Sequence, residues 1–308
     1  MRVSIIIPTF NRSAILRQLL QALFLDNESS AALEHEIIVV DDLSTDDTFE
    51  MVKQNFPMTK LLRGPGKNAE AAKRAAVEIS TGDYIVALDD DSMPAPGWLA
   101  RVKSALERGE DIVQAKIIWV DLGQANIHDE SSKRSFRTGF RFDMMPIALL
   151  FGGYRPQYIN ICHEFGCFVS RRVLKDVPLD DRNLMFHHLG ESASFYLRAK
   201  DKGYRVYFEP ACVIEHLGAL AGGCQDRSQK TSTKKNCTDF TTGVVHNIMI
   251  LTRLHQPWRI PILIPYYLAG GVYLSIKQRK NCVKYFSRGL SAGLRKKLQP
   301  IVPYSNVA

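Results

Sequence analysis

The sequence predicts an α/β protein built around a wound, Rossmann-like sheet. Runs of β-branched and apolar residues alternate with helix-like segments through the first hundred residues, and this alternation indicates parallel strands joined by crossover helices. Acidic residues directly follow two of these runs, as Asp41-Asp42 and as Asp89-Asp90-Asp91. Since sheets of this kind bind ligands beyond the carboxyl ends of their strands, we expect the functional site at that edge.

The first strand is expected at Val3–Ile7, a continuous apolar run that fits a strand buried on both faces. Leucines at helical spacing then predict a helix through Ile15–Leu23. Ser44 and Thr45 are suited to begin the helix after the second strand, because their hydroxyls can cap it. The other strands of this half are expected at 36–40, 61–62 and 84–88, and the other helices at about 45–54 and 69–79.

The middle of the chain is less regular. Apolar patterns predict a helix at Trp98–Leu106 and a strand at Ile112–Val120, whereas residues 121–160 carry no pattern that assigns them. Residues 218–238 are rich in Gly, Ser, Thr and Lys, and this composition predicts a mobile loop. Further strands are expected at 164–170, 205–208 and 212–215, and a helix at 191–202.

From Val244 the chain becomes apolar and then basic. Residues 244–254 predict a helix, and Ile260–Ile276 is a 17-residue uncharged segment that contains Pro261 and Pro265. A full membrane span needs about 20 apolar residues, and tyrosines typical of bilayer interfaces recur in this segment. We therefore expect a re-entrant or interfacial membrane anchor followed by a basic, lipid-facing helix. The alternative is a buried helical pair in a soluble protein.

The charge is unevenly distributed. Residues 277–308 hold eight basic and no acidic residues, and they carry the whole net charge of +8 because the rest of the chain is balanced. A basic tail after an apolar segment favours an anionic membrane surface, and the chain has no recognisable nucleic-acid-binding module. The six cysteines form no Cys-x-x-Cys pair, which argues against zinc and favours free thiols in a reducing compartment. Without a visible secretory signal, we expect a cytoplasmic protein, peripheral on the inner face of the membrane.

The aspartates at 89–91 point to a divalent cation. Carboxylates packed this closely repel one another unless a cation neutralises them, and Mg²⁺ is held by one or two carboxylates together with substrate phosphates. In an extended segment Asp89 and Asp91 lie on the same side, so one can meet a metal while the other meets a ribose. At Asp41-Asp42 a carboxylate can accept hydrogen bonds from a base such as uracil. The alternatives are a solvated acidic turn at 89–91 and helix capping at 44–47.

Three segments that end in polar residues stand in a fixed order: 3–12 (VSIIIPTFNR), 36–46 (EIIVVDDLSTD) and 82–91 (GDYIVALDDD). They resemble the N-terminal half of the family 2 glycosyltransferases, strongly over 1–110 and more weakly over about 160–217. The resemblance implies a GT-A fold, a nucleoside-diphosphate-sugar donor, Mn²⁺ or Mg²⁺, and inversion at the anomeric carbon. It divides the chain into a donor-binding half (1–110), an acceptor-binding and catalytic half (111–243) and the C-terminal helical region (244–308).

By this resemblance the donor site lies at the strand ends. Asp91 is implied as the direct metal ligand. His216 ends a strand-like stretch whose histidine often reaches the metal in the family, and it is implied as a secondary ligand; the alternative is a structural histidine. The residues implied around the donor are Pro8, Thr9, Asn11, Asp41, Asp42, Lys73, Asp89 and Asp90.

Residues 190–192, followed by Arg198, resemble the family's Glu-Asp motif before an arginine on the same helix. Ser192 stands where the family has Asp, which leaves Glu191 as the carboxylate implied for the general base. The competing interpretation of Glu191 is a residue stabilised by the dipole at a helix N-terminus. The other candidates near the cleft are interpreted as fold contacts or surface residues: His163, His187, His188, Arg171 and Arg172.

The sequence thus predicts an inverting, metal-dependent glycosyltransferase that uses a nucleotide-sugar, with UDP-sugar favoured, and a glycan or lipid-linked acceptor. One alternative is a sugar-phosphate nucleotidyltransferase, which would need a glycine-rich phosphate loop where residues 8–12 stand. The other is a non-catalytic protein that binds membrane or acidic polymer through a decayed transferase site, for which Ser192 is the main argument. The sequence assigns neither the sugar, the base, the acceptor, the linkage nor the oligomeric state.

Overall fold

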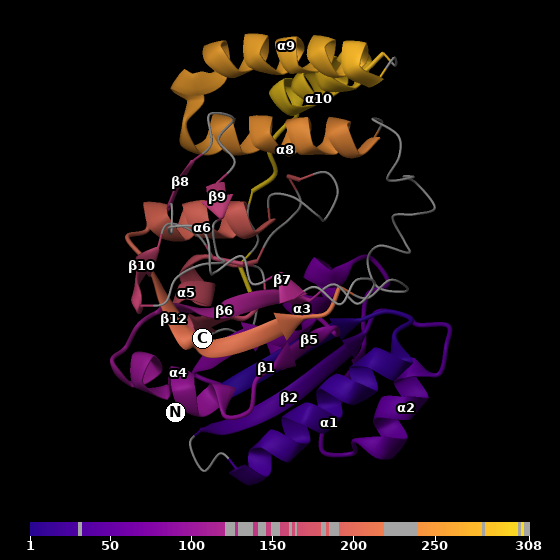
Figure 1. The fold of residues 1–308 in the computed structure, drawn as a ribbon, viewed down its shortest axis with the longest axis vertical. Coiled ribbons are helices and arrows are strands. Elements are labelled where there is room, and N and C mark those ends of the chain that lie inside the picture. The colour runs from indigo at the N-terminus through magenta and orange to yellow at the C-terminus, as the bar shows by residue number, and fades with distance from the viewer. Residues whose placement is uncertain are drawn as a thin grey trace.

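The computed structural model has two parts, a mixed sheet covered by helices and a three-helix layer beyond one face of that sheet (Figure 1). The sheet follows the order β10-β12-β6-β11-β4-β1-β2-β3. The structure describes residues 1–29, 33–120, 127–128, 138–140, 146–148, 155–159, 162–163, 165–179, 183–184, 191–218, 239–278, 281–300 and 303–304.

The first half of the chain supplies four parallel strands, which overlap the predicted ones. They are β1 (Arg2–Thr9), β2 (Glu34–Asp41), β3 (Lys60–Arg63) and β4 (Tyr84–Ala87), connected by α1 (Ser13–Ser29), α2 (Thr48–Asn55) and α3 (Ala69–Ile79). In the ladder Thr9 pairs with Asp41, and Asp41 pairs with Arg63. The carboxyl ends of β1, β2 and β3 are therefore level with one another.

The second half adds the strands that make the sheet mixed. β11 is antiparallel to both β4 and β6, while β12 is parallel to β6. The short strand β7 pairs with the last two residues of β6, and β10 pairs with β12. β8 and β9 form a separate two-stranded sheet. The bounds are β5 (Ser92–Pro94), α4 (Trp98–Glu107), β6 (Ile112–Val120), β7 (Ile127–His128), β8 (Thr138–Phe140), β9 (Pro146–Ala148), β10 (Gln157–Ile159), β11 (Cys167–Ser170), α5 (Arg171–Asp176), α6 (Glu191–Asp201) and β12 (Val206–His216).

β12 is a single strand, so the prediction of two strands at 205–208 and 212–215 was wrong. Its register to β6 shifts between Glu209 and Val213, which makes Pro210 part of a β-bulge rather than a turn. Proline lacks the N–H that a regular ladder needs, and it is tolerated at bulges. The strand continues past the bulge to His216, which lies opposite Ser92 of β5.

The side chains of β1 alternate between two apolar cores. Val3, Ile5 and Ile7 pack on the face that α1 and α4 cover, whereas Ile6 packs on the face that α3 and α6 cover. All four are buried, so the strand is covered on both faces, as its continuous apolar run predicts.

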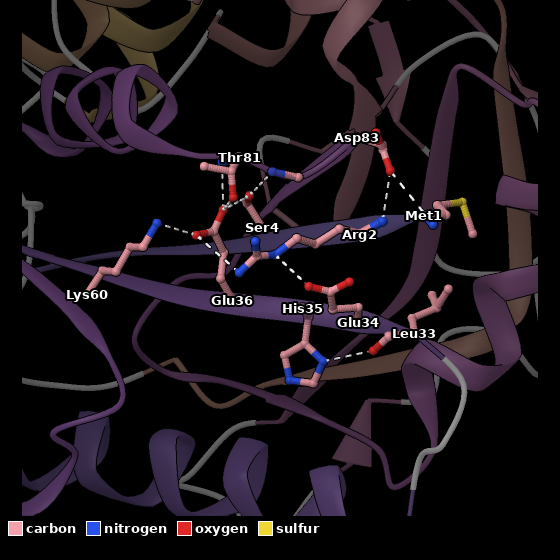
Figure 2. Close-up of polar contacts among 11 residues, drawn as sticks. Met1, Arg2, Ser4, Leu33, Glu34, His35, Glu36, Lys60, Thr81 and Asp83 are labelled. Carbon is pink, nitrogen blue, oxygen red and sulfur yellow. Dashed lines mark hydrogen bonds and ion pairs between the residues drawn. The ribbon is translucent and has the colours of Figure 1, made fainter.

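A buried carboxylate ties the strands together at the edge opposite the carboxyl ends (Figure 2). The Glu36 carboxylate accepts hydrogen bonds from Ser4 Oγ (2.5 Å), Thr81 N (2.6 Å) and Thr81 Oγ1 (2.9 Å), and it forms an ion pair with Lys60 (2.6 Å). Burial alone raises the pKa of Glu36, but the hydrogen bonds from Lys60, Ser4 and Thr81 outweigh it and lower the pKa to about 2. The ionised carboxylate therefore joins β1, β2 and β3 to the turn before β4.

The C-terminal layer consists of α8 (Asp239–His255), the 3-10 turn η2 (Pro257–Arg259), α9 (Ile260–Gln278) and α10 (Val283–Arg295), and α9 is its outermost helix (Figure 1). α9 runs continuously through Pro265, so this proline does not end the helix. The 20 residues Pro257–Ile276 are long and apolar enough to cross a bilayer, and few of them are buried in the structure.

The basic helix α10 packs closely against α8. A Cβ at Gly289 would lie 2.6 Å from the carbonyl oxygen of Thr242, and one at Gly293 would lie 2.7 Å from Met249 Cβ. These two glycines therefore allow the close approach. Phe286 and Leu290 are buried in the same layer, so α10 is an integral part of a packed three-helix unit.

The end of the chain returns to the sheet. Tyr304 is buried in the core that contains α3, α5 and α6, and its hydroxyl accepts a hydrogen bond from Leu179 N (3.2 Å). Arg74 of α3 lies over the ring at 4.5 Å and donates to the carbonyl oxygen of Pro303 (2.7 Å). The described residues after α10 thus fasten the helical layer to the sheet.

Candidate active site

The ends of β1, β2 and β4 meet at one edge of the sheet. Backbone hydrogen bonds continue past the strands, from Asp42 N to Thr9 O (2.9 Å) and from Leu88 N to Ile6 O (2.9 Å). They hold the residues after β4 beside those after β1. Asp41, Asp42, Asp90 and Asp91 are buried here, so the two acidic segments are brought together, as expected from parallel strands.

Asp89, Asp91 and His216 form the group of potential metal ligands in the described part of the chain. One ligand atom from each lies within 4.8 Å of the others, and Asp91 Oδ1 lies 3.3 Å from His216 Nδ1. Atoms that bind one cation at about 2.0–2.3 Å lie at most about 4.6 Å apart. The spacing and the oxygen-rich ligand set fit Mn²⁺ or Mg²⁺, with both expected ligands, Asp91 and His216, in the group.

Asp90 is not part of this group. Its Oδ2 accepts a hydrogen bond from Thr9 Oγ1 (2.8 Å), and its Oδ1 pairs with Arg12 Nη1 (2.6 Å). Burial raises the pKa of Asp90 to about 6, against the opposing effect of the Arg12 charge. Both Asp90 oxygens therefore have protein partners, although the resemblance implies a role at the donor for Asp90 and for Thr9.

Lys73 lies on α3 with a side chain that is 3% exposed, and it forms an ion pair with Glu70 (2.8 Å). Burial raises the pKa of Asp89, and the charge of Lys73 opposes this shift. A cavity of about 50 Å³ lies beside Lys73, lined by Glu70, His163, Phe195 and mostly apolar neighbours. Lys73 thus lies beside this cavity, within electrostatic reach of Asp89.

Asp41 and Asp42 organise the loops around the end of β2. Asp41 Oδ1 accepts a hydrogen bond from Ser44 N (3.1 Å), and Asp41 Oδ2 pairs with Arg63 (2.5 Å), whose guanidinium lies 3.7 Å from the Phe49 ring centroid. Asp42 Oδ1 accepts from Gly66 N (2.6 Å). These two carboxylates hold the loops after β2 and β3 in position at the place expected for a nucleoside.

Asn11 joins the loops after β1 and β2. Its Oδ1 accepts a hydrogen bond from Thr45 N (2.7 Å), and its own N–H donates to Ser44 Oγ (2.9 Å). Asn11 has a φ of 52° and Leu43 a φ of 64°, both in the left-handed region that non-glycine residues rarely occupy. Pro8, which precedes Thr9 in β1, lies at the same end of the sheet.

The start of α2 differs from the prediction. The helix begins at Thr48 instead of at about residue 45, because Ser44 and Thr45 bind Asn11 and are not available as caps. Asp46 Oδ1 instead accepts hydrogen bonds from Thr48 N (3.0 Å) and from Thr48 Oγ1 (2.5 Å). The N-cap residue of α2, Asp47, makes no side-chain capping hydrogen bond, so the acidic loop binds the first residue of the helix through Asp46 and organises the loops through Asp41 and Asp42.

Glu191 is the first residue of α6, and its side chain lies outside the described residues, as do His187 and His188. Burial lowers the pKa of His163 to about 3; its ring lies 5.2 Å from that of Phe165, which lies 4.8 Å from that of His216. Arg171 donates to the backbone of Ser80 and Gly82. His163 and Arg171 thus make fold contacts, and the predicted 218–238 loop also lies outside the described part beyond Gly218.

Two arginines of the site were not singled out by the sequence pattern. Arg12 lies between Asp90 and Asp91, and Arg63 pairs with Asp41. Arg12 directly follows Asn11 at the end of the first motif, so a search for a countercharge to the three aspartates would have found it. Nothing comparable marks Arg63, whose partner is determined by the strand register.

Comparisons with known proteins agree with this arrangement. The family model described as "Glycosyl transferase family 2" matches residues 4–177. An uncharacterised glycosyltransferase, YibD, of Escherichia coli K12 is 30% identical over 122 residues, which cover 38% of this chain and 34% of that protein. A dolichol-phosphate mannosyltransferase of Pyrococcus furiosus is 32% identical over 115 residues, which cover 36% of this chain and 32% of that protein. The aligned regions thus span about a third of the length of these relatives.

The architecture is shared more widely than the sequence. The crystal structure of GalNAc-T7 with UDP, GalNAc and Mn²⁺ superposes with a TM-score of 0.62 at 14% identity, covering 82% of this chain and 48% of that one. At this identity the likeness concerns the fold alone. The expected GT-A fold is confirmed.

Proposed function

The chain belongs to glycosyl transferase family 2, and from this membership we propose that it moves a sugar from a nucleoside-diphosphate sugar to an acceptor hydroxyl with inversion. The acceptor oxygen bonds to the anomeric carbon while the bond from that carbon to the diphosphate oxygen breaks. The nucleoside diphosphate leaves, and the acceptor proton passes to a base. A UDP-sugar is the favoured donor, with Pro8, Thr9, Asn11, Asp41 and Asp42 shaping the nucleoside pocket.

One observation carries the proposal above the others: Asp89, Asp91 and His216 converge at the end of β4 within reach of one cation. We assign Mn²⁺ or Mg²⁺ to this group, with Asp91 as the principal ligand. A bound divalent cation offsets the negative charge that develops on a leaving diphosphate. Lys73, buried beside the aspartates, adds positive charge on the same side.

Glu191 is assigned as the general base that takes the acceptor proton. Phe195, one turn further along α6, lines the cavity beside Lys73. Residues four apart lie on the same face of a helix, so position 191 shares its face of α6 with Phe195. A base placed at this point can receive a proton from an acceptor that enters opposite the donor diphosphate.

A donor screen with the full chain tests this assignment. Purified protein is incubated with UDP-, GDP- and dTDP-sugars, with and without Mn²⁺, and nucleoside diphosphate release is measured. We expect release from a UDP-sugar that requires the metal and is lost in Asp91→Asn. Release of pyrophosphate from a nucleoside triphosphate and a sugar phosphate would instead identify a nucleotidyltransferase. Absence of both reactions and of UDP binding would leave a non-catalytic binding protein.

The outer face of α9 supports a membrane-borne acceptor. The helix buries Leu263, Tyr267 and Gly271 against α8 and α10, and its opposite side is open to solvent. Every exposed residue between Ile260 and Ile276 is apolar or aromatic: Pro261, Ile262, Pro265, Tyr266, Leu268, Ala269, Val272, Tyr273 and Ile276. A helix that is apolar all round is normally buried in protein or in lipid, so the open side is expected to meet a lipid surface.

The surrounding charges favour an anionic membrane over a second copy of the chain. No acidic residue follows Asp239, while Lys284, Arg288 and Arg295 are exposed on α10. Two copies joined through α9 would bring these cations together, whereas anionic lipid headgroups would neutralise them. Because α9 already packs lengthwise on α8 and α10, it lies in the interface rather than across the bilayer.

The cytoplasmic face is the side we assign, since the described cysteines at 162, 167, 212 and 282 are free and buried, as in reducing compartments. The acceptor is then a glycan or a lipid-linked sugar at that surface. The relative from Pyrococcus furiosus, named a dolichol-phosphate mannosyltransferase, belongs to this class of enzyme.

Co-sedimentation tests the membrane contact with vesicles of phosphatidylcholine, with and without phosphatidylglycerol. We expect binding that is stronger on the anionic vesicles and that is lost in an Ile276→Asp, Tyr273→Asp double variant. The matched control is Met58→Asp, which places a charge on an exposed methionine away from α9. Equal binding of the double variant and the wild type would contradict the assigned surface.

A further inference from the structure

A buried guanidinium lies inside the aspartate cluster. Arg12 comes from the loop between β1 and α1, and its side chain is 9% exposed. Its Nη1 lies 2.6 Å from Asp90 Oδ1 and 3.2 Å from Asp91 Oδ2. One arginine nitrogen therefore touches the carboxylates of two consecutive aspartates.

The two carboxylate oxygens of Asp91 have different partners. Oδ2 faces Arg12, while Oδ1 lies 3.3 Å from His216 Nδ1, on the side of the metal-ligand group. A carboxylate held at one oxygen cannot rotate freely about its Cβ–Cγ bond. Because Arg12 holds Asp91 Oδ2, it is Asp91 Oδ1 that remains for a cation.

Asp90 provides the fixed point for Arg12. Its two oxygens bind Arg12 and Thr9 Oγ1, so the guanidinium is tied to the end of β1 through a second carboxylate. On the other side the Arg12 backbone N–H donates to Thr48 Oγ1 at the start of α2 (3.2 Å). The arginine is therefore held at its backbone by the first residue of α2 and at its side chain by the segment after β4.

We propose that Arg12 is a positioning residue that orients Asp91 Oδ1 toward the cation. The inference rests on the proposed function, because it concerns the metal ion assigned to Asp89, Asp91 and His216. Arg12 is the outer partner of a ligand, and such partners tune metal affinity by fixing the geometry of the ligand they touch. Its low exposure and two carboxylate partners argue against a direct contact with the donor diphosphate.

The direction in which cation affinity changes when Arg12 is removed distinguishes a positioning role from a purely electrostatic one. Arg12 carries a positive charge close to the cation group, so its removal should strengthen cation binding if only Coulomb repulsion mattered. If Arg12 orients Asp91, its removal should weaken binding although a repulsive charge has disappeared. The two accounts predict opposite shifts for the same substitution.

The test measures Mn²⁺ binding directly, by electron paramagnetic resonance of free Mn²⁺ in the presence of UDP, for the full chain and three variants. Arg12→Met removes the hydrogen bonds and the charge, and Arg12→Lys keeps the charge without the planar guanidinium. Arg172→Met is the matched control, since Arg172 pairs with Asp111 before the start of β6, whereas His216 lies beside the other end of that strand. We expect Mn²⁺ affinity to fall about tenfold to a hundredfold in Arg12→Met, the usual effect of losing such a partner, less in Arg12→Lys, and to stay unchanged in Arg172→Met.

Unchanged or tighter Mn²⁺ binding in Arg12→Met would overturn the inference, as would a loss of UDP affinity in metal-free buffer, which would indicate a diphosphate contact. If Arg12→Met fails to fold, Arg12→Lys decides by the same criterion, with wild-type Mn²⁺ affinity as the contrary result. A wild-type chain that binds UDP but no Mn²⁺ would overturn the metal site itself and this inference with it. Normal wild-type binding with unaffected variants would overturn the inference alone.

Discussion

Glu36 offers a quantitative test of the fold at the edge opposite the active site. The Glu36→Gln substitution keeps the size of the side chain but removes its charge and turns one acceptor oxygen into a donor. The Glu36 side chain is 5% exposed and binds Ser4, Thr81 and Lys60. The new amide would face at least one donor group, and a buried polar group without its partner costs about 1–3 kcal/mol.

The pKa gives an independent magnitude. A folded-state pKa of about 2, against an ordinary value of 4.5, corresponds to about 3 kcal/mol of stability at neutral pH. Because the folded pKa is the lower one, this stability is present above about pH 4.5 and is lost as the pH falls toward about 2. We therefore expect Glu36→Gln to lower the free energy of unfolding by about 3 kcal/mol at pH 7, and by much less near pH 2.

Urea unfolding followed by circular dichroism measures the difference at pH 7, 5, 4 and 3. The matched control is Glu34→Gln in the same strand, since the Glu34 side chain is 73% exposed and its ion pair with Arg2 is long at 3.6 Å. Such surface pairs contribute about 0–1 kcal/mol. A difference for Glu36→Gln that equals that of the control, or that does not narrow as the pH falls, would refute the reasoning.

Three further substitutions test other parts of the structure. Glu191→Gln should lower turnover by about 10²–10⁴-fold, the usual contribution of a general base, with UDP affinity unchanged in calorimetry; near-normal turnover would move the role to another carboxylate. Gly289→Ala should lower the melting temperature of the helical layer, because the added Cβ would lie 2.6 Å from the Thr242 carbonyl oxygen. The control Gly270→Ala, whose Cβ would lie 3.6 Å from Phe286, should be tolerated. Equal effects of the two substitutions would contradict the close packing. Tyr304→Ala should destabilise the sheet by about 3 kcal/mol, as large-to-small core changes do, and unchanged hydrogen exchange in α3 would show that the ring contributes little.

The parallel half of the fold was predictable because each strand is an apolar run that ends at a polar residue. β1 and β2 were expected from residues 3–7 and 36–40, and the register then places Thr9 beside Asp41. The convergence of two acidic segments followed from the rule that ligands bind at the carboxyl ends of parallel strands. Local pattern and topology agree in this half, so little tertiary information was needed.

The remaining features depend on contacts that no local pattern encodes. Pro210 looked like a strand breaker, but the ladder to β6 absorbs it as a bulge. Ser44 looked like a helix cap, but its hydroxyl binds the backbone of Asn11. Arg12 had no role assigned from the sequence, but the structure places it between Asp90 and Asp91. In each case a partner distant in sequence determines the role.

The packing of Tyr304 against the sheet has a consequence for biosynthesis. Tyr304 belongs to the core shared by α3, α5 and α6, although about 225 residues separate it from the end of α3. During synthesis Tyr304 leaves the ribosome after α8, α9 and α10, so this core is completed only when these three helices have emerged. We therefore expect the apolar face of α9 to be exposed before the sheet reaches its final packing, so that contact with lipid precedes the last step of folding.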